Sequence, residues 1–179
     1  DAQESRGLGD VYKRQGYEDL KRIDILPGKK VIIKGNHDYW WSSKNKLENL
    51  DLKTIHFLFN DSVIYEDFYI FGTRGWLPKD YLDFTEDDEK IYVRELNRLK
   101  NSYNSKKSEG LKKIALIHYP PFNFSGEPNE FFKFLSDEKV DFCLYGHLHG
   151  DGHSLIKEGI IDGIDAVSYT HLTLPTTPY

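Results

Sequence analysis

Residues 30–38 of the chain have the sequence KVIIKGNHD, a short apolar strand followed at once by a polar loop. The run of three β-branched residues at Val31–Ile33 predicts a strand that is buried on both faces, as in a parallel sheet. The loop Gly35–Asp38 then follows at the carboxyl end of that strand. Ligands of open α/β sheets bind at this end of the strands. The stretch therefore predicts an α/β fold and the edge of the sheet where a functional site belongs.

The same arrangement recurs twice further along the chain. Lys113–Ile117 predicts a second buried strand, and His118 follows it directly. Asp141–Tyr145 predicts a third strand, which ends in the loop Gly146-His147-Leu148-His149-Gly150. Imidazole is a good ligand for divalent transition metals, and two histidines two residues apart in a tight loop can face one site. Four histidines at strand ends therefore favour a metal centre over unrelated loop histidines.

The rest of the chain predicts alternating helices and strands around these three segments. Thr85 and the acidic residues after it are typical of a capped helix start, which is a simpler interpretation of the acidic run than a metal site. The alternation is typical of an α/β domain. Helices are predicted over Tyr17–Ile25, Ser42–Leu50, Glu86–Tyr103 and Asn129–Ser136, strands over Thr54–Phe59, Ser62–Glu66 and Phe68–Gly72, and a hairpin over His153–Lys157 and Gly159–Ile164.

The composition of the 179 residues predicts one globular domain without the basic field of a general nucleic-acid binder, because the net charge is −5. The single cysteine, Cys143, allows no intrachain disulfide and fits a reducing compartment, so a cytoplasmic location is expected. No apolar run approaches the length of about 20 residues that a membrane-spanning helix needs. The chain contains no methionine, so we expect a processed chain, a domain cut from a longer one, or a damaged record.

Taken together, these segments resemble the calcineurin-like metallophosphoesterases, and their wider context resembles a bacterial predicted-phosphohydrolase branch of that family. The resemblance runs from about Gly16 to Gly163 and implies a two-sheet sandwich flanked by helices. The combination of four sequence strings makes the resemblance specific, since any one string alone would be weak evidence for the family. The strings are KGNHDYWW at residues 34–41, GTRGW at 72–76, HYPP at 118–121 and YGHLHG at 145–150.

The resemblance also implies a ligand set for two divalent metal ions, which can be Mn, Fe, Zn or Mg. Asn36, through its side-chain carbonyl, together with His118 and His147 would bind one ion, and His149 would bind the other. Two such cations neutralise phosphoryl oxygens and lower the pKa of a bridging water, which then attacks phosphorus. Cys143 is expected only to pack within its strand.

Three further side chains are candidates for catalysis and substrate binding. By resemblance, His37 would donate a proton to the leaving-group oxygen or stabilise charge on the phosphoryl group, oriented by Asp38. Arg74, in a glycine-flanked loop, is a candidate for bidentate phosphate binding, with a structural surface arginine as the alternative. Packing in the core and lining a substrate pocket both remain open for the three tryptophans, Trp40, Trp41 and Trp76.

Two motifs of the family, Asp-x-His and Gly-Asp-x-x-Asp, do not occur before Gly35. Gly9-Asp10 matches the start of the second motif, but Lys13 stands where its second acid belongs. We therefore expect an N-terminally truncated domain that lacks its first strands, with an incomplete second metal site. The truncation also predicts open sheet edges at Val31–Ile33 and Ile114–Ile117.

The expected organisation is a partial metallophosphoesterase domain at residues 16–165 between two tails, 1–15 and 166–179, that are not native to the gene. The expected function of the intact parent is hydrolysis of a phosphate mono- or diester, with this chain inactive alone. A degenerate, non-catalytic metal-binding α/β module is the alternative. The expected partner is a small phosphorylated substrate; nucleic acid is not favoured, and no membrane partner is expected.

Overall fold

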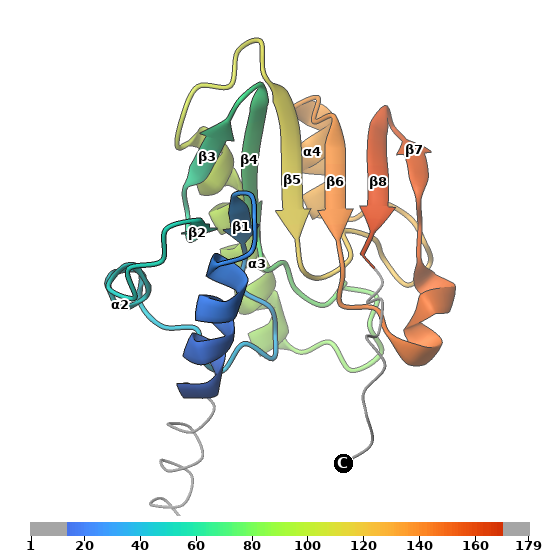
Figure 1. Ribbon diagram of the computed structural model, residues 1–179. Coiled ribbons are helices and arrows are strands. Elements are labelled where there is room, and N and C mark those ends of the chain that lie inside the picture. Colours follow the sequence, from blue (N-terminus) through green and yellow to red (C-terminus); the bar gives the residue numbers. More distant parts are fainter. Residues whose placement is uncertain (1–13, 170–179) are drawn as a thin grey trace, which may run out of the picture.

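The computed structural model describes residues 14–169, in which helices and strands alternate as predicted for an α/β protein (Figure 1). The first helix covers residues 14–24. The elements that follow are β1 (Lys30–Ile32), α2 (Lys44–Glu48), β2 (Ile55–Phe57), β3 (Ser62–Tyr65), β4 (Phe68–Thr73), α3 (Glu86–Asn104), β5 (Lys112–Ile117), α4 (Glu130–Asp137), β6 (Phe142–Tyr145), the 3-10 helix η1 (Gly150–Leu155), β7 (Gly159–Ile161) and β8 (Ile164–Ser168).

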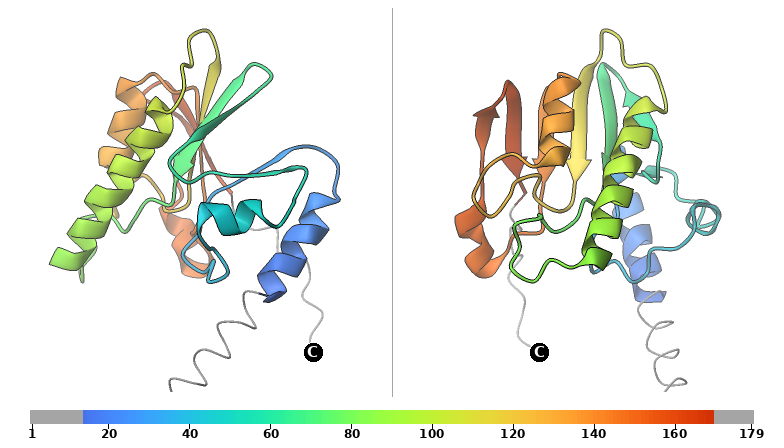
Figure 2. Two further views of the ribbon diagram at one scale, coloured as in Figure 1. Left: turned by 90° about the vertical axis from the view of Figure 1, so that its left-hand side faces the viewer. Right: turned by 180° about the vertical axis from the view of Figure 1, so that it is seen from behind.

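The larger sheet has six strands in the order β3-β4-β5-β6-β8-β7. Its four middle strands run parallel to one another, and β3 and β7 pair antiparallel at the two edges. Parallel neighbours need a crossover connection, which is usually a helix. Here α3 connects β4 to β5 and α4 connects β5 to β6, and both helices cover the same face of the sheet (Figure 2).

The smaller sheet consists of β1 and β2, which pair in parallel. It lies on the opposite side of the six-stranded sheet from α3 and α4, together with the first helix and α2 (Figure 2). The chain therefore forms two sheets with helices outside them, in agreement with the sandwich that the resemblance implies.

Two groups of apolar side chains hold these layers together. The larger group fills the space between the six-stranded sheet and its helices and includes Phe71, Phe131 and Cys143. Burial raises the pKa of the Cys143 thiol to about 12, so this cysteine packs and is not reactive. The smaller group is built on Leu20, Leu47 and Phe57, and Trp40 and Trp41 pack against it. These two tryptophans are therefore part of the second core.

The predicted cap at the start of α3 is confirmed. The Thr85 hydroxyl accepts a hydrogen bond from the Asp88 N–H, and the Asp88 carboxylate accepts one from the Thr85 N–H, which forms a capping box. The Asn129 side-chain oxygen accepts hydrogen bonds from the N–H groups of Phe131 and Phe132 at the start of α4. Ser43 is the N-cap residue of α2, but its side chain makes no capping hydrogen bond there. The acidic run after Thr85 is thus a helix start. None of the helices within residues 14–169 combines the length and the apolar character needed to cross a membrane.

Two expectations about local structure are wrong. The hairpin lies further along the chain than predicted: His153 belongs to η1, and the two strands of the hairpin are β7 and β8. The segment at Ile114–Ile117 is not an open edge either, because β5 pairs with β4 on one side and with β6 on the other. These pairings bury Ala115 and Ile117 in the middle of the sheet.

The last strand of the six-stranded sheet, β8, extends past residue 165, where the domain was expected to end. β8 crosses that boundary and pairs in parallel with β6 through Ser168. Ala166 and Ser168 are buried there. Of the expected tails at residues 1–15 and 166–179, the parts at 1–13 and 170–179 lie outside the described residues.

The Asp24 carboxylate joins the end of the first helix to the start of β2. It accepts hydrogen bonds from the backbone N–H groups of Lys53 and Thr54, at 3.0 and 2.7 Å, and from the Thr54 hydroxyl at 2.7 Å. These bonds, led by the one from Lys53, lower the pKa of Asp24 to about 2. A carboxyl group whose pKa is lower in the folded chain stabilises the fold above its unfolded pKa.

We expect the Asp24→Asn variant to be less stable than the parent chain at pH 7. The difference should shrink as the pH falls from about 4 to about 2, because the parent carboxylate is protonated in that interval. Chemical denaturation at several pH values measures this. Asp19→Asn, on the exposed face of the same helix, is the matched control. A stability difference that stays constant down to pH 2 would contradict the role given to the Asp24 charge.

Candidate functional site

The site residues predicted from the sequence lie close together at the carboxyl ends of β5 and β6. Ile117 pairs with Tyr145, so these two strands end level with each other. His118 follows β5 directly, and its carbonyl accepts a hydrogen bond from the Gly146 N–H at 3.2 Å. His147 therefore leaves β6 beside His118. The loop after β1 approaches from the smaller sheet and brings Asn36 to the same place.

The side chains of Asn36, His118 and His147 meet at one point. His118 Nε2 lies 2.7 Å from Asn36 Oδ1 and 3.3 Å from His147 Nδ1. The two imidazole rings stand nearly perpendicular, with centroids 5.1 Å apart. All three side chains are half-buried. We call these three residues the Asn–His cluster.

The spacing of the Asn–His cluster fits the ligands of one metal ion. Two nitrogen ligands of a tetrahedral zinc ion lie about 3.4 Å apart, because each bond is about 2.1 Å long. The cluster offers two imidazole nitrogens and an amide oxygen at comparable separations. Within residues 14–169, no group of three or more histidine, cysteine, aspartate or glutamate side chains is arranged to hold a metal ion. The amide oxygen of Asn36 is the third polar atom of this cluster.

The backbone and the charge state of His147 suit this role. His147 has a φ of 71°, in the left-handed region that non-glycine residues seldom occupy. Four other non-glycine residues of the described chain also have a positive φ, so this conformation marks the tight turn after β6. Burial lowers the pKa of His147, and the positive charges of His149 and His37 lower it further. A lower pKa keeps the imidazole neutral, which is the form that binds a metal.

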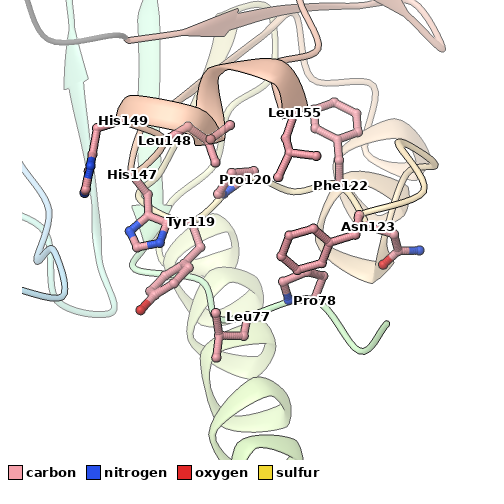
Figure 3. A pocket seen from close by; sticks show the side chains of 12 residues that line it. Leu77, Pro78, Tyr119, Pro120, Phe122, Asn123, His147, Leu148, His149 and Leu155 are labelled. Carbon is pink, nitrogen blue, oxygen red and sulfur yellow. The ribbon is translucent and has the colours of Figure 1, made fainter. Parts of the chain in front are cut away.

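His149 and His37 lie near the cluster but outside it. Both are exposed, and their charges act on His147. His149 is the N-cap residue of η1, and its side chain stands apart from His147 in Figure 3. The His37 ring makes an edge contact with Tyr39, at 6.2 Å between centroids. All four histidines predicted at strand ends are thus brought to one region of the surface.

Asp38 contacts the loop backbone. Its carboxylate accepts a hydrogen bond from the Gly35 N–H at 2.6 Å, and in the described part of the chain it makes none with the His37 ring. Gly35 is confined, because a Cβ atom there would lie 3.1 Å from Asp38 Oδ2 and 3.2 Å from His118 Cε1. Asp38 and Gly35 together fix the loop that presents Asn36 to His118.

A half-open pocket of about 250 Å³ begins beside the cluster. Its walls combine His147 and His149 with mainly apolar side chains, as Figure 3 shows. The Tyr119 ring lies 4.2 Å from the His147 ring. Tyr119 is not among the site residues predicted from the sequence, although it follows His118 directly in the chain. Other lining residues are Leu77, Pro78, Pro120, Phe122, Leu148 and Leu155.

Arg74 follows β4, the next strand beyond β5. Its backbone carbonyl accepts a hydrogen bond from the Tyr119 N–H at 2.9 Å. The guanidinium group stacks on the Trp76 ring, 4.4 Å from the ring centroid, and one of its nitrogens lies 3.4 Å from the carboxylate of Glu95. Burial lowers the pKa of Arg74, and the charge of Glu95 opposes this shift. The side chain is therefore largely enclosed, in contrast to a surface arginine.

Glu95 is a buried carboxylate that sequence analysis did not single out. Its position in the sequence could have identified it, because Glu95 lies four residues from both Ile91 and Leu99, on the apolar face of α3. A charged residue on that stripe must be paired when it is buried. Its partners come from β4 and from α3 itself.

Comparison with protein-family models finds a match to the calcineurin-like phosphoesterases over residues 7–151. Comparison with curated proteins and with solved structures finds no match. The matched range includes the loop after β1, the ends of β4 and β5, and the histidine loop after β6. The chain belongs to the calcineurin-like phosphoesterase family.

Proposed function

We propose that this chain carries part of the catalytic site of a metal-dependent phosphohydrolase that cleaves a phosphate mono- or diester. The convergence of Asn36, His118 and His147 on one point carries the proposal. Three neutral donors at this spacing suit a divalent cation. Bound metal ions in such a centre supply Lewis acidity and an activated water at neutral pH. His149 is proposed as a ligand of a second ion.

The chain's own residues supply positioning and proton transfer in this proposal. Gly35 and Asp38 hold the loop that carries Asn36 and His37. His37 is exposed beside the cluster and is proposed to donate a proton to the leaving-group oxygen. The pocket next to His147 and His149 offers an apolar wall for the organic part of the ester.

The alternative proposal is a non-catalytic module that keeps one metal site for binding. The coding sequence upstream of residue 16 separates the two proposals. An Asp-x-His motif followed by Gly-Asp-x-x-Asp there supports the enzyme, because these motifs supply acidic ligands that the described cluster does not contain. A start codon close to Gly16 supports the binding module.

We expect the chain to bind one equivalent of Mn²⁺ or Zn²⁺ at the Asn–His cluster. His118→Ala and His147→Ala should each weaken this binding by at least roughly tenfold, because each removes a direct ligand. Isothermal titration calorimetry measures the affinity. His153→Ala, a histidine substitution in η1 outside the cluster, should leave it unchanged. Unaltered affinity in both cluster variants would contradict the proposed metal site.

The chain alone should show negligible Mn²⁺-dependent hydrolysis of an aryl phosphate, because the two upstream motifs do not occur in its sequence. A colorimetric assay at several metal concentrations measures this. Robust turnover that His147→Ala abolishes would show that the residues present suffice for catalysis. The same assay on the full-length parent, with a panel of metals, tests the enzyme proposal itself.

Asp38→Ala should lower the free energy of unfolding by about 1–2 kcal/mol, because it leaves the Gly35 N–H without its charged acceptor. Asp38→Asn keeps an oxygen acceptor and should lose less. Chemical denaturation of the metal-free chain measures both variants. If both substitutions lower the free energy of unfolding equally, an oxygen acceptor at residue 38 contributes nothing to stability, which contradicts the role given to the Gly35 hydrogen bond.

A further inference from the structure

A second pocket, of about 390 Å³, opens beside the carboxyl end of β4. The carboxyl ends of β1 and β4 meet the middle of α3 there. Four of its lining residues are cations, and the only anionic side chain among them is that of Glu95; we call it the basic pocket. The cations are Lys34, Arg74, Arg94 and Arg98.

Glu95 organises the arginines of the basic pocket. One of its carboxylate oxygens lies 2.7 Å from an Arg98 nitrogen, 3.4 Å from an Arg74 nitrogen and 3.8 Å from Arg94 Nε. The other oxygen accepts a hydrogen bond from the Thr73 hydroxyl at 2.8 Å. Glu95 itself is only 1% exposed, so its charge is covered by these partners. The carboxylate thus holds three guanidinium groups together and presents little negative charge to a ligand.

The charge of the basic pocket is not balanced by Glu95. A single arginine is enough to pair a buried carboxylate, and further cations held close together repel one another. Arg94 and Arg98 keep about half of their side-chain surface exposed, at 54% and 44%. They are therefore open to an incoming anion, whereas a purely structural ion pair would leave no positive charge unmatched.

Arg74 adds a donor that has no partner. Its Nε atom is buried, and no hydrogen-bond acceptor lies within reach among the described residues. Leaving a buried donor unsatisfied is costly, and such groups often mark a place for a missing ligand. The stacking of the guanidinium on Trp76 fixes its plane. Arginine held in this way suits the bidentate recognition of phosphate oxygens.

We propose that the basic pocket binds a phosphate group through Arg74, Arg94 and Arg98, with Lys34 completing the positive field. Binding there requires no metal ion and no hydrolysis, so it is separate from the chemistry proposed for the Asn–His cluster. Backbone connections place the two sites side by side: Lys34 precedes Asn36 by two residues, and the Arg74 carbonyl is bonded to the residue after His118.

The test is a titration of the full chain with pyrophosphate in a buffer that contains EDTA. Trp41 lines the basic pocket and Trp76 lies under Arg74, so tryptophan fluorescence reports on occupancy, and calorimetry gives the affinity. We expect saturable binding that weakens as salt is added. Arg94→Gln and Arg98→Gln should each weaken it by roughly tenfold, the loss of one charge-assisted contact.

Matched controls separate this effect from a general loss of charge. Lys90→Gln changes an exposed cation on the same helix that pairs with Asp87, and Arg22→Gln changes an exposed arginine of the first helix. Both should bind pyrophosphate as the parent chain does. Circular dichroism and denaturation midpoints confirm that each variant is folded. The exposed Arg94 and Arg98 are chosen because Arg74→Gln also removes the stacking on Trp76.

Two results overturn the proposal. The first is absence of saturable binding, or binding that Arg94→Gln and Arg98→Gln both leave unchanged. The second is binding that His147→Ala removes while the arginine variants retain it, since the anion then sits on the histidines. A parallel titration with inorganic phosphate identifies the source of the group: tighter pyrophosphate indicates a larger phosphorylated ligand, and equal affinities indicate free phosphate. Metal-free conditions keep these outcomes independent of the proposed hydrolysis.

Discussion

The parallel register of β4, β5 and β6 is the constraint on which the candidate site depends. Thr73 pairs with Ile117, and Ile117 pairs with Tyr145, so the three strands end at one level. His118 and His147 therefore leave the sheet beside each other. Side chains alternate between the two faces of a strand, and a shift of one residue would turn the whole strand over. The buried residues of β5 and β6 oppose such a shift, because it would expose them.

The loop after β1 adds the one donor that the large sheet cannot provide. It reaches the histidines from a separate two-stranded sheet, whose position is set by the smaller core of Leu20, Leu47 and Phe57. The absence of a side chain at Gly35 permits the close approach to His118. The site is thus assembled from two sheets with different cores, and the stability of the smaller core decides how firmly Asn36 is held.

Much of the architecture follows from local sequence. Short apolar runs located β1 and β5, and Thr85 marked the start of α3, because apolar runs and capping side chains act on their own neighbours. The hairpin was placed too early along the chain because η1 has no comparable apolar pattern. The sheet order was not predicted either, and β5 proved to be central where an open edge was expected.

By itself, the sequence determined which side chains stand at the ends of strands, since that depends only on local order along the chain. The tertiary structure decided which of them meet. It brought His118 and His147 against Asn36, placed Asp38 on the loop backbone, and surrounded Glu95 with arginines from β4 and α3. Contacts between residues far apart in sequence depend on how layers pack, and side-chain packing is specified by the whole core at once.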